Sequence, residues 1–144
     1  MINLVIQIIV AGIVATLVMT AFSYLLSAVT NYKLKEPQFI NLLLSKSRLF
    51  SLDIEKTHLL GWMLHFMVGI SFVVCYHLLR TLNVLNDSLV HALLFGLTAG
   101  LIGVAFWWIT LRLHSNPPKL NRSFYLFQLI PAHIIFGVMV GFLM

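Results

Sequence analysis

Histidines inside long apolar segments are the residues of this sequence most suited to chemistry. His65 lies about seven residues inside the apolar segment 58–80, and His133 lies about ten residues inside the segment 123–144. If both segments enter a membrane from the same face, the two depths differ by roughly 5 Å at about 1.5 Å per residue, which helix tilt can absorb. We therefore expect His65 and His133 to be able to face each other inside a helical bundle.

Two neutral imidazoles on facing helices can ligate a b-type haem or supply part of a metal site. His77 and His91 offer a second pair, but His65 and His77 are about 120° out of phase on a helix, which argues against two haems. A zinc or iron site would normally recruit further ligands, and no Asp or Glu lies inside an apolar segment. The alternative is structural, because a neutral histidine can join helices by a hydrogen bond to a hydroxyl or carbonyl group, and we favour it.

Four apolar segments, each long enough to cross a membrane, would position these histidines. The chain is 60% hydrophobic and only 9% charged, with a mean hydropathy of +1.00. A soluble domain would have about a quarter of its residues charged, whereas a spanning helix needs ~20 apolar residues. We predict an all-α, polytopic four-helix membrane bundle in a single domain. Its spans are expected at 2–29, 58–80, 88–113 and 123–144.

Small residues recur at four-residue spacing in these segments, and they allow helix backbones to approach closely. In the second segment Gly61 and Gly69 flank His65 on one helical stripe, so this stripe should face protein rather than lipid. The residues expected to pack helices together are Gly12, Thr16, Gly61, Gly69, Gly96, Gly100, Gly137 and Gly141.

The connection between the first two spans contains a shorter amphipathic stretch, predicted as a helix at about 37–50. Pro37 suits the first turn of a helix, and about fourteen residues are too few to span. We expect this helix to lie in the membrane interface, with a partner-binding helix as the alternative. The basic residues expected to contact lipid headgroups are Lys33, Lys35, Lys46 and Arg48.

The formal net charge of +5 is concentrated on one predicted face of the membrane. All lysines and arginines except Arg80 fall in or beside the first and third connections, so we interpret the charge as a topology signal rather than as nucleic-acid binding. The positive-inside rule places these connections in the cytoplasm and both termini on the periplasmic side of a bacterial inner membrane.

Catalytic motifs are not evident. The sequence has no G-x-S-x-G motif, no phosphate loop and no pair of intramembrane carboxylates. The acids Glu36, Asp53, Glu55 and Asp87 all lie in predicted connections, so a transport carboxylate is not indicated. The single cysteine, Cys75, excludes an intramolecular disulfide and a Cys-rich metal site. We therefore expect a protein that is not an enzyme.

Three motifs resemble a known family. They are Gly12-x-x-Ala15-Thr16-x-x-Met19-Thr20, then Gly61-x-x-x-His65-Phe66, and finally Ala132-His133-x-x-x-Gly137-x-x-x-Gly141. Together they resemble the small four-helix bacterial inner-membrane proteins classed as domains of unknown function. This resemblance implies the fold and the location, and it draws attention to His65 and His133, but it implies no activity.

Three functions are compatible with the sequence. We expect a small inner-membrane component, in contact with the lipid bilayer, that acts through helix packing with a protein partner or with itself. The first alternative is an electron-transfer protein that binds a single b-type haem or a metal through His65 and His133. The second alternative is an oligomeric channel or transporter for a small solute.

Overall fold

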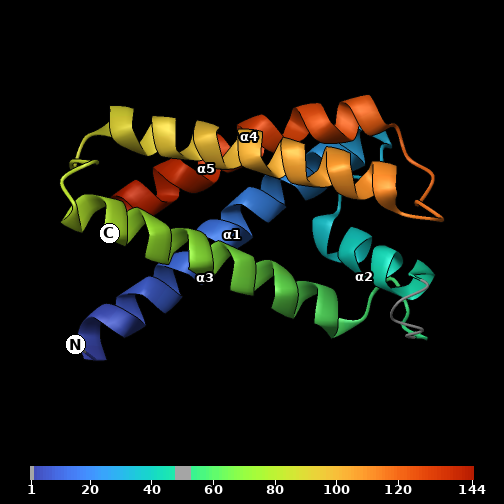
Figure 1. Cartoon of the computed structure of the whole chain (residues 1–144), viewed down its shortest axis with the longest axis horizontal. Helices are drawn as coiled ribbons and strands as arrows, with labels where there is room; N and C mark the ends of the chain where they lie inside the picture. Colours follow the sequence, from blue (N-terminus) through green and yellow to red (C-terminus); the bar gives the residue numbers. More distant parts are fainter. Residues whose placement is uncertain (1, 48–52) are drawn as a thin grey trace.

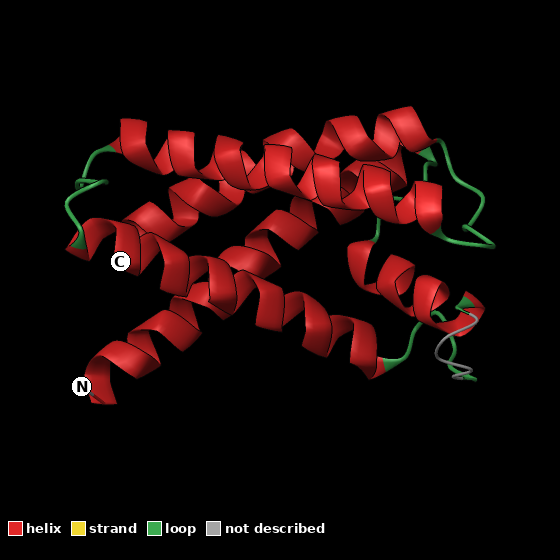
Figure 2. Ribbon diagram, in the orientation of Figure 1, coloured by secondary structure: helices red, strands yellow, loops and turns green. Residues whose placement is uncertain are grey.

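The computed structural model describes residues 2–47 and 53–144, and these residues form an all-α fold (Figures 1 and 2). Four of the helices are long and apolar enough to cross a membrane, which confirms the predicted fold class, and each ends within one residue of its predicted bounds. The helices are α1 (Ile2–Thr30), α2 (Glu36–Lys46), α3 (Leu59–Thr81), α4 (Leu89–Leu113) and α5 (Arg122–Leu143).

Local signals set the ends of the spanning helices. Ser88 and Asn121 cap α4 and α5, because their side-chain oxygens accept hydrogen bonds from backbone N–H groups in the first turn. Asn31 and Asn83 follow the last residues of α1 and α3 with φ values of 58° and 57°. Asparagine tolerates this left-handed conformation better than most residues, so the chain can leave each helix there.

Helix α1 occupies the centre of the arrangement, packing against α5 on one side and against α3 on the other, while α4 packs along α5. Aromatic side chains fill the space between α3 and α4. The ring of Phe95 lies 5.0 Å from that of Tyr76 and 6.4 Å from that of Phe72, measured between centroids. The main apolar core therefore lies where α1, α3, α4 and α5 converge.

Glycines permit the closest backbone approaches. A Cβ atom on Gly137 would lie 2.6 Å from Cα of Gly96, and one on Gly96 would lie 2.5 Å from the carbonyl oxygen of His133. Across the other interface, Gly12 lies against the backbone of Ile70, and a Cβ on Gly69 would collide with the Thr16 hydroxyl. Both helix contacts therefore depend on the missing side chains.

The two ends of the bundle differ in charge. At one end, the Lys33 ammonium donates to the carbonyl of Lys119, and the remaining described basic residues other than Arg80 lie in the connections and helix turns of the same end. At the other end, where both termini lie, Arg80 pairs with Asp87 and donates to the carbonyl of Met144 (Figure 1). The first and third connections thus share one face, as predicted.

The predicted interfacial helix corresponds to α2, with two differences. The helix ends at Lys46 rather than near residue 50, and Arg48, with the rest of 48–52, lies outside the described residues. In addition, α2 packs against the start of α3 instead of lying only against lipid. Its buried residues include two polar ones, Glu36 and Asn41.

Replacing Gly96 with alanine should weaken the α4–α5 contact, because the new methyl group meets backbone atoms that cannot rotate away. We expect a loss of about 1–3 kcal/mol, measured by reversible unfolding in detergent. Gly103→Ala is the matched control, since its Cβ would meet the His133 ring at 3.3 Å, a side chain that can shift. Equal stability of the two variants would contradict close backbone packing at Gly96.

Candidate functional site

The carboxyl group of Glu36 is buried at the start of α2, where only 5% of the residue is exposed. The Gln128 amide donates to Glu36 Oε1 at 2.8 Å, and the Gln128 amide oxygen accepts a hydrogen bond from the Ser23 hydroxyl at 3.0 Å. Three helices, α1, α2 and α5, therefore meet through side-chain hydrogen bonds. The second carboxyl oxygen, Oε2, has no hydrogen-bond partner among the described residues.

Burial raises the pKa of the Glu36 carboxyl from 4.5 to about 7. Hydrogen bonds from Gln128 and the backbone favour the charged form and oppose this shift only in part. The neighbouring Lys35 forms no ion pair with this carboxyl, and its ammonium group lies 4.9 Å from the centre of the Tyr24 ring. Glu36 is thus able to exchange a proton near neutral pH.

Tyr125 forms the aromatic wall of this cluster. Its hydroxyl is fully buried, has no hydrogen-bond partner among the described residues and lies within electrostatic range of Glu36. The rings of Tyr125, Phe39 and Trp107 pack against one another, with centroid distances of 4.8 Å from Tyr125 to Phe39, 5.7 Å from Tyr125 to Trp107 and 5.1 Å from Phe39 to Trp107. An aromatic cluster therefore lies beside the Glu36 carboxyl.

Asn41 fixes the position of α2 against the chain that leads into α3. Its amide nitrogen donates to the carbonyls of Lys56 at 3.1 Å and His58 at 2.6 Å. Gly61 lies beneath the carbonyl of Pro37, where a Cβ atom would collide with it. Helix α2 is therefore held by polar contacts on both sides, through Glu36 to α5 and through Asn41 to the segment before α3.

His65 joins α3 to α1. Its Nε2 atom lies 2.9 Å from the Thr20 hydroxyl, and that hydroxyl donates its only proton to the carbonyl of Thr16 at 2.7 Å. Nε2 must consequently carry the proton and donate to Thr20, so it is not available as a metal ligand in this state. This contact is the interhelical hydrogen bond that we favoured as the structural role of the histidine.

His133 has different partners. Its Nδ1 donates to the carbonyl of Leu129 at 2.8 Å, and its ring lies over Gly103 and 6.3 Å from the ring of Phe72. No hydrogen bond links His133 to His65 in the described residues. A haem ligated by both would require His65 to release Thr20 and the packed rings to separate, so the geometry does not favour this alternative.

Three further histidines, His58, His91 and His114, form hydrogen bonds at or near helix ends. His58 accepts the N–H of Leu60 at the start of α3, His114 bonds to the carbonyl of Leu43, and His91 contacts Ser88 and Asn86. Within residues 2–47 and 53–144, no three His, Cys, Asp or Glu side chains come together as a possible metal site.

The two polar clusters share one face of α1. Thr16, Thr20 and Ser23 are all buried there, with Thr20 next to His65 and Ser23 next to Gln128. Sequence analysis identified the threonines but missed Glu36 and Gln128. The available signals were Glu36 directly before a helix-starting proline, and Gln128 as an isolated amide inside an apolar span.

A scan of the sequence against protein-family models finds no match, and searches of the curated proteins and of the solved structures find no similar protein. Function must therefore be argued from the geometry of the chain itself.

Replacing Thr20 with valine should weaken the α1–α3 contact, since valine keeps the shape of the side chain but leaves the His65 Nε2 proton without an acceptor. We expect a loss of about 1–2 kcal/mol in detergent unfolding. Thr98→Val is the matched control, because the Thr98 hydroxyl is exposed and bonds only within its own helix, to Leu94. A Thr20→Val protein as stable as the control would contradict the assigned hydrogen bond.

Proposed function

We propose that this chain is a non-enzymatic component of the bacterial inner membrane whose packing with a partner, or with a second copy, is controlled by one proton on Glu36. The observation that carries the proposal is a buried carboxyl, with a pKa of about 7, that forms no ion pair within the described residues. Buried ionisable groups in membrane proteins are costly to maintain and are associated with function.

The proton would act through helix α2. Neutral Glu36 can remain between Gln128 and Tyr125 at little cost, whereas the ionised form places an unpaired charge among aromatic rings. Ionisation therefore favours release of the first turn of α2 from α5. The contacts of Asn41 lie on the other side of α2 and do not change charge, so this helix can loosen without leaving the bundle.

Transport receives less support from the geometry. The buried hydroxyl groups of α1 end at Thr16, and the buried residues before it are Ala15, Gly12 and Ala11. The buried polar side chains of α1 thus lie only in the half nearer the basic end. Such an arrangement suits a proton-binding site open to one side better than a path across the membrane.

Packing with a partner or second copy is supported by the extent of apolar surface. No more than about a third of the most apolar window of each spanning helix is buried within the chain. The remaining surface meets lipid, and part of it is available for another transmembrane protein.

We also propose that the basic end faces the cytoplasm and that both termini are periplasmic. The support is the positive-inside rule, since Arg80 is the one described basic residue at the end that carries the termini. Glu36 would then exchange its proton with the cytoplasm.

Cysteine labelling in cells tests this topology. In a Cys75→Ser background, a membrane-impermeant maleimide should label Val84→Cys in spheroplasts, because the connection between α3 and α4 is predicted to be periplasmic. Ser115→Cys, in the connection between α4 and α5, should react only after the membrane is permeabilised. The opposite labelling pattern would show that the basic end faces outward.

The stability of the folded protein should fall as the pH rises. Because the pKa of Glu36 is raised from 4.5 to about 7 on folding, the folded state binds the proton more tightly. The contribution of Glu36 protonation to the free energy of unfolding is fully present below pH 4.5. It decreases between pH 4.5 and 7 and is lost above pH 7. The full difference is about 3 kcal/mol, measurable by unfolding in detergent at a series of pH values.

Glu36→Gln should remove this pH dependence and make the variant more stable than the natural protein at pH 8. Glu55→Gln is the control, since Glu55 is an exposed acid on the same end of the molecule. Unchanged pH dependence in Glu36→Gln would overturn the proposal that Glu36 is the controlling group.

A further inference from the structure

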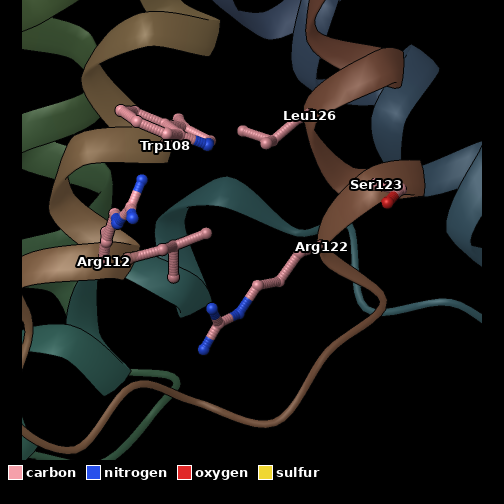
Figure 3. A pocket seen from close by; sticks show the side chains of 6 residues that line it. Trp108, Arg112, Arg122, Ser123 and Leu126 are labelled. Atoms are coloured by element: carbon pink, nitrogen blue, oxygen red, sulfur yellow. The ribbon is translucent and has the colours of Figure 1, made fainter.

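A hollow of about 320 Å³ opens between the last turns of α4 and the first turn of α5, at the basic end of the molecule (Figure 3). Its volume lies near the lower limit of small-ligand sites, so it suits a compact group rather than a large molecule. The residues that line it are Trp108, Leu111, Arg112, Arg122, Ser123 and Leu126.

Two arginines from different helices face this hollow, and no carboxylate lines it. Arg112 comes from α4 and Arg122 from α5, as Figure 3 shows. Neither forms an ion pair within residues 2–47 and 53–144, where the described ion pair joins Arg80 to Asp87. Two unpaired guanidinium groups at one cavity provide fork-shaped donors that match the oxygens of a phosphate group.

Neighbouring groups strengthen the preference for an anion. The Arg112 guanidinium lies 5.0 Å from the centre of the Trp108 ring, which restrains its orientation. The Ser123 hydroxyl lies in the first turn of α5 and offers a neutral donor, and the positive end of the helix dipole lies there as well. Each of these contributions favours a bound phosphate.

The remaining walls indicate that the phosphate belongs to a lipid. Leu111, Leu126 and the Trp108 ring are apolar. Trp108 and Leu126 lie about one turn deeper along α4 and α5 than Arg112 and Arg122, and Leu111 directly precedes Arg112. Trp108 is 51% exposed and lies near the end of α4. Tryptophan is enriched at this position in spanning helices, where it meets the membrane interface. A phospholipid would place its phosphate between the arginines and the start of its acyl chains along these apolar side chains.

We propose that this hollow binds the phosphate of an anionic phospholipid through Arg112, Arg122 and Ser123. The site is separate from the Glu36 cluster and does not depend on the function proposed for it. Lipid binding there would clamp α4 to α5 at the cytoplasmic surface, in addition to the glycine contacts deeper in the membrane.

Native mass spectrometry of the full chain in detergent tests the proposal. The protein is equilibrated with equal amounts of phosphatidylglycerol and phosphatidylcholine, and the retained lipids are counted. We expect selective retention of phosphatidylglycerol, reduced about tenfold or more in the double variant Arg112→Gln/Arg122→Gln. Both arginines are exposed and lack ion pairs, so this variant should still fold, which its circular dichroism spectrum would verify.

The double variant Lys56→Gln/Lys119→Gln is the control, because it removes the same charge from exposed positions at the same end of the molecule that do not line the hollow. It should retain phosphatidylglycerol as the natural protein does. Equal losses in both variants would show diffuse attraction to the basic end and would overturn the site. No preference between the two lipids would overturn it as well. Displacement of the lipid by millimolar inorganic phosphate would instead assign the hollow to free phosphate.

Discussion

The hydrogen bond from the Gln128 amide to the Glu36 carboxyl determines how the non-spanning helix α2 is attached to the bundle. Water is scarce at such a position, so buried polar groups must be satisfied by the protein itself. The Gln128 amide meets this requirement by bonding to Ser23 on α1 and to Glu36 on α2. Because the acceptor is an ionisable group, we propose that the attachment of α2 changes with pH.

Helix α1 combines close packing with hydrogen bonding. Threonine and serine side chains are small enough for another helix to approach, and their hydroxyl groups supply the partners that buried side chains need. Thr20 accepts from His65, and Ser23 donates to Gln128, so residues on one face of α1 hold both α3 and α5. The hydrogen bond from His65 to Thr20 joins α3 to α1 and gives this intramembrane histidine a structural role that needs no cofactor.

Much of the fold could be predicted from the sequence because membrane crossing depends on hydrophobic length. Apolar length and the absence of charge located all four spans. Glycine spacing indicated Gly96 and Gly137 as packing residues, and the structure places them against each other. The site was harder to predict, because hydropathy along the chain does not reveal which polar residues fold back into a bundle. Glu36 lies in a polar connection by sequence, yet α2 returns it to the interior.

The paired histidines illustrate a second limit. Residue counting predicts the depth of each histidine along its span, but the direction of each side chain depends on how the helices are rotated about their axes. His65 is directed to Thr20 of α1, while His133 lies against Gly103 of α4 and Phe72 of α3.

Infrared difference spectroscopy during a pH titration tests most directly whether Glu36 exchanges a proton near neutral pH. A carboxylic acid band that disappears with a midpoint near pH 7, and that is absent from Glu36→Gln, is the result we expect. A midpoint near 4.5, as for a carboxyl in water, would contradict the account.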